Sequence, residues 1–209
     1  MHSPFSILHS QFLTMDRFNK SILAIILITL AGCGVVRQAE EISRLADCEF
    51  RLASIEKLKL AGVNIQGIKS YSDLGMTQLA RIGATLAGGA LPLEFILNVE
   101  AKNPNSEQAA MSRMEWIILI DDIEMTNGII ESRVVIPPDN GISIIPVKIN
   151  IDLVKHLSGQ SAGPLLNFGF NLAGIGGTPS RITLKAKPTI YVGSRAIEYP
   201  GYIKITQKY

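Results

Sequence analysis

Short segments of alternating apolar and polar residues, separated by turn residues, constrain the fold of this chain more than any other feature. In residues 91–101 the apolar side chains fall at every second position. Successive side chains of a β-strand point to opposite faces, so this period of two predicts a strand with one buried face. Further strands are predicted over residues 49–60, 114–125, 129–136, 142–151, 181–187, 189–192 and 202–206. Segment 49–60 contains one slip in its alternation, which indicates a β-bulge.

Turn residues connect the predicted strands closely. Asn103-Pro104-Asn105 and segment 137–141 are rich in the residues that form turns. Asn127-Gly128 is a strong hairpin signal between segments 114–125 and 129–136. Several short strands with close turns predict a mainly β fold, an antiparallel β-sandwich, as a single domain over residues 48–209.

One or two helices accompany the strands. Residues 72–87 have helical spacing, with Ser72 or Asp73 as the expected N-cap and Gly88-Gly89 as the stop. The small and apolar residues expected on one stripe of this helix are Met76, Leu79, Ala80, Ile82, Gly83, Leu86 and Ala87. Residues 152–157 and 164–173 are predicted to be short helical pieces, and residues 174–177 a glycine-rich loop.

The N-terminal region has the pattern of a secretory signal. An apolar run at residues 22–31 follows Arg17 and Lys20 and precedes small residues. A membrane span needs about 20 apolar residues, so this run is too short to cross a bilayer. A buried helix of the domain is the alternative, but the run has no polar face. Met15 would open a signal of ordinary length, and a long charged region starting at Met1 is the other possibility.

Leu30-Ala31-Gly32-Cys33 resembles the lipobox of bacterial lipoproteins. The resemblance implies that a signal peptide, residues 1–32, is removed and that Cys33 carries acyl chains, including palmitate, which anchor the protein in a membrane. Several acyl chains together anchor a protein stably in a membrane, whereas a single acyl chain binds only weakly. Gly34 stands where some bacteria place an inner-membrane retention aspartate, which predicts a location at the outer membrane, facing the periplasm. Residues 33–47 are polar and are predicted to be a tether.

Residues 98–102 running into Asn103-Pro104-Asn105 resemble the signature of the late embryogenesis abundant (LEA) type 2 family, whose members share the WHy domain. The segment Ile136-Pro137-Pro138 and the terminal hairpin at 189–205 add to the resemblance. It implies a fibronectin-like or immunoglobulin-like sandwich with a helix, a role in stress response, and no enzymatic activity. The helix at residues 72–87 departs from the simplest plant pattern.

Composition excludes some functions. The formal charge is +2, without the basic surplus of nucleic-acid binding proteins, so no nucleic-acid partner is expected. Two cysteines and three histidines leave little material for a disulfide scaffold or a metal site, and no cofactor is expected. Cys48 would be the one thiol left after lipidation of Cys33, and we expect it to be buried.

The sequence contains three patterns that imitate catalytic or binding motifs. Ser161 lies in a Gly-x-Ser-x-Gly pattern at residues 159–163, but His156 precedes it and only Glu198 follows as a carboxylate, so we interpret the pattern as a loop. Asp122 and Glu124 would share a strand face while Asp121 would point away, and two aligned carboxylates fall short of a calcium site. The glycines of 174–177 lack the lysine of a phosphate loop.

These observations favour a lipid-anchored, non-enzymatic domain of the cell envelope, of LEA type 2 kind, that binds a partner or protects against stress. The membrane, through Cys33, is the one partner that the sequence identifies, and an unknown protein or lipid is the other. The alternative is a periplasmic carrier of an apolar ligand such as a lipid, with residues 82–97 and 165–172 lining a cleft.

Overall fold

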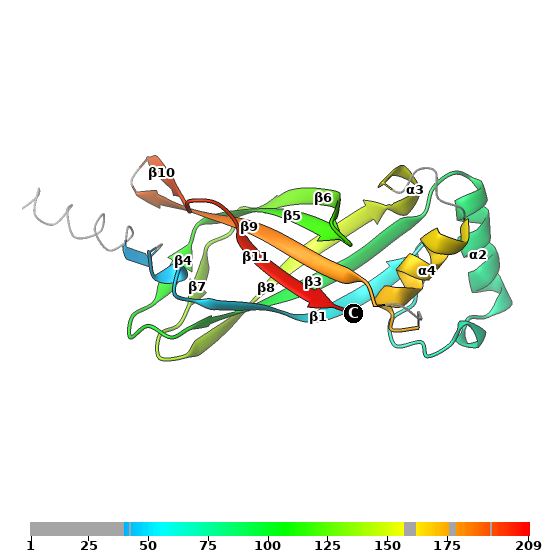
Figure 1. The fold of residues 1–209 in the computed structure, drawn as a ribbon, viewed down its shortest axis with the longest axis horizontal. Helices are drawn as coiled ribbons and strands as arrows, with labels where there is room; N and C mark the ends of the chain where they lie inside the picture. The colour runs from blue at the N-terminus through cyan, green and yellow to red at the C-terminus, as the bar shows by residue number, and fades with distance from the viewer. Residues whose placement is uncertain (1–39, 42, 157–161, 176–178, 193) are drawn as a thin grey trace, which may run out of the picture.

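Two antiparallel sheets face each other as a sandwich (Figure 1). The computed structural model describes residues 40–209 apart from 42, 157–161, 176–178 and 193. One sheet has the order β2-β1-β3-β8, formed by Val63–Asn64, Glu49–Leu60, Pro92–Asn103 and Gly141–Asp152. The other has the order β10-β9-β5-β6, formed by Arg195–Glu198, Arg181–Val192, Arg113–Ile120 and Ile123–Ile130. Strand β11 (Ile203–Lys208) also pairs with β9, and β4 (Ala109–Met111) pairs with β7 (Val134–Ile136). The predicted mainly β sandwich is confirmed.

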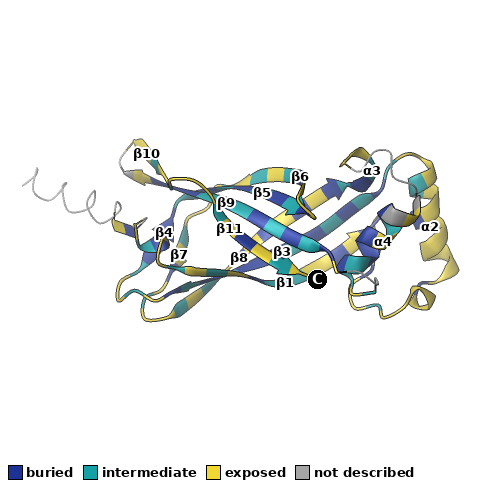
Figure 2. Cartoon of the chain, viewed as in Figure 1, coloured by how far each residue is buried: buried dark blue, intermediate teal, exposed yellow. Residues whose placement is uncertain are grey.

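The core lies between the sheets, where every second side chain of the long strands is buried. Figure 2 shows the alternation as bands along the strands. The first sheet contributes Leu52, Leu58, Leu60, Leu93, Phe95, Leu97, Val99, Ala101, Ile145, Val147, Ile149 and Ile151. The second contributes Met114, Trp116, Ile118, Ile120, Met125, Ile182, Leu184, Ala186 and Ile205. Full burial of one such large side chain stabilises the fold by about 1.5–3 kcal/mol.

Strand β1 runs over the predicted residues but contains two irregularities instead of one. Its register against β3 shifts between Leu52 and Ser54 and again between Glu56 and Lys59. At the second shift Lys57 has a φ of 56°, in the left-handed region that residues with a side chain seldom adopt. The slip in the sequence pattern therefore does mark a bulge.

Helical segments gather at one end of the sandwich (Figure 1). They are η1 (Tyr71–Asp73), α2 (Met76–Ala87), α3 (Leu153–His156) and α4 (Ala162–Leu172). Helix α2 begins after Gly75, whose N–H is bonded by the side chain of Gln78, and not after Ser72 or Asp73 as predicted. The difference arises because Ser70 and Asp73 cap the separate turn η1. The helix ends at the predicted Gly88-Gly89, and Gly89 lies in the left-handed region at φ 83°.

Helix α2 is mostly exposed, although its small and apolar residues were expected to form one stripe. Of its residues only Ile82 is buried, and Met76 is 86% exposed. The helix lies beyond the ends of the sheets (Figure 1). Helix α4 instead delivers Leu165, Phe168 and Phe170 to the core, and Gly169 lies against Leu60.

Asn127-Gly128 is not a hairpin turn, so this prediction is wrong. Both residues lie inside β6, where Gly128 pairs with Trp116 of β5. The chain turns earlier, at Asp121 and Asp122, whose φ angles of 47° and 68° fit the left-handed geometry of a two-residue hairpin. Glycine is needed at position 128 because the indole of Trp116 lies against its backbone, and an added Cβ would lie 2.4 Å from Cζ2 of Trp116.

The remaining strand predictions hold with small changes. Segment 137–141 turns through Asp139 and Asn140, at φ 56° and 62°, and leads into β8. The segments predicted separately at 181–187 and 189–192 form the single strand β9, which accommodates Pro188. Within the described part of the chain, no helix has the length and apolar character needed to cross a membrane.

Replacing Gly128 by alanine tests the pairing with Trp116. Gly128→Ala should lower the free energy of unfolding by about 1–3 kcal/mol, because the new methyl group meets the indole ring. Chemical denaturation and the near-UV circular dichroism of Trp116 measure the effect.

The matched control is Gly83→Ala on the exposed side of α2, where nothing lies within 4 Å of the added Cβ. This variant should gain about 1 kcal/mol of stability, since alanine favours a helix over glycine. A Gly128→Ala protein as stable as the wild type would contradict the observed register.

Candidate functional site

Asn103 is the buried centre of a hydrogen-bond network at the end of β3. Its side chain is 0% exposed. Its Nδ2 donates to the carbonyl oxygens of Glu107 and Ile136, at 2.9 and 3.1 Å. Its Oδ1 accepts from the backbone N–H and the side-chain Nδ2 of Asn105, at 3.1 and 2.7 Å. One amide side chain thus joins the loop after β3 to strand β7.

The backbone of the same corner bonds the turn between β7 and β8. Asp139 donates its N–H to the carbonyl of Asn105, and Asn140 donates to that of Asn103, both at 2.8 Å. These two backbone bonds tie the loop after β3 to the turn that leads into β8. Asn103-Pro104-Asn105 therefore lies where two connections of the sandwich meet, and both asparagine side chains are occupied by contacts within the domain.

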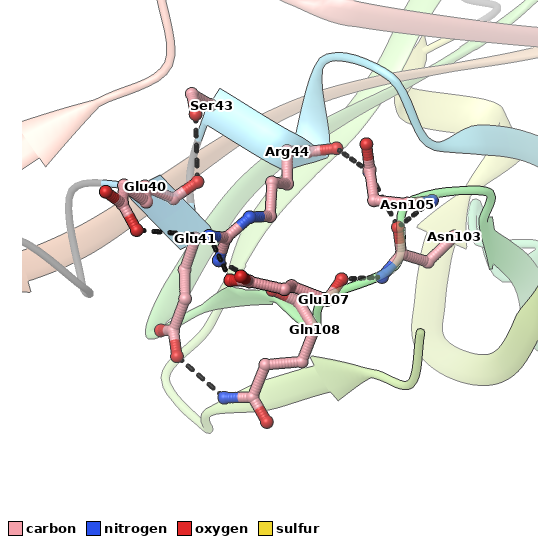
Figure 3. A network of polar contacts seen from close by, with 8 residues as sticks. All are labelled: Glu40, Glu41, Ser43, Arg44, Asn103, Asn105, Glu107 and Gln108. Atoms are coloured by element: carbon pink, nitrogen blue, oxygen red, sulfur yellow. Dashed lines mark hydrogen bonds and ion pairs between the residues drawn. The ribbon is translucent and has the colours of Figure 1, made fainter. Parts of the chain in front are cut away.

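The segment before β1 is attached to this corner (Figure 3). Arg44 forms ion pairs with Glu40, at 3.1 Å, and with Glu107, and it donates to the carbonyl of Gln108. Asn105 donates from Nδ2 to the carbonyl of Arg44, at 3.2 Å. The corner thus holds this segment through both its backbone and its charged side chain.

Glu41 adds a buried charge to the attachment. It is 2% exposed, and its two carboxylate oxygens bond Nε2 of Gln108 and Nη2 of Arg133, each at 2.7 Å. A buried carboxylate is strongly destabilising when one of its partners is removed, so these contacts fix the segment firmly. Leu45, 1% exposed, belongs to the hydrophobic core.

These contacts change the view of the predicted tether. Residues 40–47 lie in the segment that was expected to be a spacer at 33–47, yet they pack onto the domain. In the sequence, Ile42 and Leu45, three residues apart, give a weak helical signal, but a polar stretch with few apolar residues resembles a solvated linker. The partners Gln108 and Arg133 are distant along the chain, which is why the attachment could not be predicted.

The other predicted residues do not come together into a site. Asp121 and Asp122 form the β5–β6 turn, and both bond Arg181. Asp121 accepts from the backbone N–H of Arg181 at 2.8 Å, and Asp122 pairs with its guanidinium. Glu124 lies on β6. Their expected positions on one strand were wrong because the strand ends before them. His156 is exposed at the end of α3. Cys33, Ser161 and residues 176–177 lie outside the described residues, and Gly174 ends α4 at φ 83°.

Cys48 is half-buried, and its thiol donates to the carbonyl of Arg44, at 3.4 Å. Burial, followed by the negative charge of Asp47, raises the pKa of the thiol to about 11. The thiolate is the reactive form of cysteine, so Cys48 is a poor nucleophile at neutral pH. The thiol packs against the core and has no geometry suited to catalysis.

A half-open cavity of about 260 Å³ lies near the end of α4, lined in part by Ile55, Leu58, Leu172 and Tyr209. Of the two segments expected to line a lipid cleft, only Leu172 reaches this cavity. The inward side chains of β3 and the apolar residues of α4 otherwise pack into the core. Burial raises the pKa of the Tyr209 phenol.

Replacing Asn103 by alanine tests the corner. Asn103→Ala should lower the free energy of unfolding by about 2–4 kcal/mol, because the buried carbonyl of Ile136, the carbonyl of Glu107 and the amide of Asn105 lose their partner. Asn127→Ala, at an exposed position of β6, is the matched control and should stay within about 0.5 kcal/mol of the wild type. Thermal unfolding measures both, and equal melting temperatures would contradict the structural role.

The raised pKa of Cys48 predicts slow alkylation. At pH 8 its reaction with iodoacetamide should be about a hundredfold slower than that of the same residue in the urea-unfolded chain, because the pKa lies about two units higher than that of an ordinary thiol. The stabilising effect of the protonated thiol is complete below about pH 9 and is lost as the pH rises through 11. Peptide mass spectrometry separates Cys48 from Cys33, and equal rates in both states would refute the prediction.

No family model matches the chain, and no curated protein does. Solved structures of distant proteins are similar in part. A protein from Archaeoglobus fulgidus is 13% identical with a TM-score of 0.33, over 75% of this chain and 96% of that one. A candidate late embryogenesis abundant (LEA) protein is 11% identical with a TM-score of 0.37, over 90% and 83%. A protein from Arabidopsis thaliana is 16% identical with a TM-score of 0.31, over 57% and 69%. These likenesses are too distant to assign a family.

Proposed function

We propose that this protein is a lipoprotein of the cell envelope, anchored through Cys33 and facing the periplasm from the outer membrane. The observation that carries the proposal is Leu30-Ala31-Gly32-Cys33 directly after the apolar run at residues 22–31. A positive region, a short apolar region and small residues before a cysteine are what a lipoprotein signal requires. Gly34 in place of aspartate supports the outer membrane.

The attachment of residues 40–47 supports a short link between membrane and domain. Six residues lie between Cys33 and Glu40, and the seven Cα-to-Cα steps that join the two residues span at most about 25 Å in a fully extended chain. Arg44, Glu41 and Leu45 hold the chain at the end of the sandwich near β4 and β7. The helical end lies opposite (Figure 1), so in this proposal it points away from the anchoring bilayer.

The domain is proposed to act without catalysis, as a binding or stress-protective module of LEA type 2 kind. The support is the strand and corner at residues 98–105, the part of the sequence that resembles the family. The two asparagines of the corner use their amide groups for contacts inside the domain, as expected of a structural motif. A periplasmic lipid carrier stays a prediction, and native mass spectrometry of the purified protein would reveal a bound lipid.

Replacing Cys33 by alanine tests the anchor. Cys33→Ala cells should show no incorporation of a palmitate analogue into this protein, because the acceptor sulfur is missing. Cys48→Ala is the matched control and should incorporate the label as the wild type does. Labelling that persists in Cys33→Ala would refute the lipoprotein proposal.

A chain that begins at Val35 behind a cleavable signal gives a second measurement of the same prediction. It should fractionate with the soluble periplasmic proteins, since the lipid is proposed as the only hold on the membrane. Sedimentation with membranes after a high-salt wash would reveal another membrane contact.

A further inference from the structure

From a pocket on the outer face of the first sheet, we infer that this protein has a binding site for a phosphomonoester on a hydroxylated carrier, such as a sugar phosphate. The pocket is half-open and has a volume of about 280 Å³. Its outward side chains are Lys57, Lys59, Glu94, Ile96, Lys148 and Asn150. Ligand pockets start at about 300 Å³, so this one suits a small ligand. The inference stands on the pocket alone and does not depend on the lipid anchor.

The register of the sheet brings the pocket residues together. Lys59 of β1 pairs with Glu94 of β3, and Glu94 pairs with Asn150 of β8. In the next outward row Ile96 of β3 pairs with Lys148 of β8. Directly paired residues on one face have neighbouring side chains. Lys59 and Lys148, from the strands on the two sides of β3, therefore lie beside Glu94 and Ile96, while Glu56 of β1 pairs with Ile96 on its other side.

The pocket carries uncompensated positive charge. It combines three lysines with one glutamate, and none of the three lysines forms an ion pair with any described residue. Glu56, which pairs with Ile96 beside the pocket, accepts a hydrogen bond from the neutral amide of Asn98 at 2.6 Å and keeps its charge, so three lysines face two carboxylates and one positive charge is left over. At the other end of the same face the charges are matched, as Arg51 pairs with Glu100 and Lys102 with Glu49.

Lys57 lies at the bulge in β1, and the bulge places it in the lining of this pocket. Its left-handed φ of 56° is costly for a lysine and persists only where surrounding contacts hold it. The side chain of Gln66 supplies those contacts. Its Oε1 accepts from the N–H groups of Lys57 and Leu58, and its Nε2 donates to the carbonyl of Ile55 at 3.2 Å. One glutamine thus takes the place of the missing strand partner.

The chemistry of the lining selects the ligand class. Lysine ammonium groups bind phosphate as point charges, and a phosphomonoester carries nearly two negative charges at neutral pH. The Glu94 carboxylate accepts hydrogen bonds and the Asn150 amide both donates and accepts them, which suits the hydroxyl groups of the carrier. Ile96 offers an apolar surface to the carrier between these polar groups. A simple anion would leave Glu94 without a partner and close to negative charge.

Calorimetric titration of the purified full chain, in a non-ionic detergent at low salt, tests the site with glucose 6-phosphate as the probe. The sugar phosphate should bind, glucose should not, and inorganic phosphate should bind more weakly. Lys59→Gln and Lys148→Gln should each weaken binding about tenfold, the effect of losing a hydrogen bond to a charged group. Lys102→Gln, on the same face but paired with Glu49, is the matched control and should leave the affinity unchanged.

Glu94→Gln gives a change of opposite sign. It should tighten the binding of inorganic phosphate, because a negative charge leaves the pocket, and reduce the preference for the sugar phosphate. All these side chains are on the outer face, so melting temperatures within a few degrees of the wild type would show that the variants fold.

Dihexanoyl phosphatidic acid, compared with dihexanoyl phosphatidylcholine, distinguishes a lipid headgroup from a free ligand. Lysine-dependent binding of the phosphatidic acid without binding of glucose 6-phosphate would overturn the inference of a hydroxylated carrier, because this lipid has no free hydroxyl group on its glycerol. Absence of binding by both phosphomonoesters, or equal binding in wild type, Lys59→Gln and Lys148→Gln, would overturn the inference.

Discussion

Strand β3 is held along both of its edges and across its whole inner face, and the rest of the sandwich is arranged around it. It pairs with β1 on one side and with β8 over twelve residues on the other. Its inward side chains, from Leu93 to Ala101, are all buried. Because a slip of one residue would turn this apolar row into solvent, the pairing has a single register. Asn103 is the last residue of β3, just beyond the apolar row. Its side-chain amide bonds the carbonyls of Glu107 and Ile136 and so fixes the end of the strand.

The sequence predicts those features that depend on local patterns. The alternation in β3 and β8, the turn at 137–141 and the glycine stop of α2 follow from side-chain period and backbone preference. The β5–β6 hairpin was misplaced because Asn127-Gly128 has the stronger turn signal, while the need for glycine comes from Trp116 on another strand. The exposure of α2 was likewise missed, since its stripe indicates a buried face but the sheets end before reaching it. Contacts such as that of Glu41 with Arg133 join residues far apart in sequence and leave no local signal.

The two proposals assign different parts of the molecule to different tasks. The end of the sandwich near β4 and β7 receives the chain from the N-terminal side and holds it by buried charge and by Leu45. The lysine pocket lies on the outer face, towards the helices, where β1 bulges. An attachment at this end, with only a short link to Cys33, would limit how far the pocket can lie from the membrane. Binding at the pocket would then occur in the space next to the bilayer.

Two short strands, β10 and β11, share one edge of β9, and this limits how another protein chain can pair with that edge. A twelve-residue strand at the edge of a sheet would offer a long row of unpaired N–H and C=O groups to another chain. Here β10, with four residues, covers one part of that edge and β11, with six, covers the other. At this edge of the second sheet a neighbouring molecule therefore meets two short, interrupted strands in place of one long template. The first sheet, by contrast, ends in the twelve-residue strand β8, so the protection from edge-to-edge pairing is confined to the β9 edge.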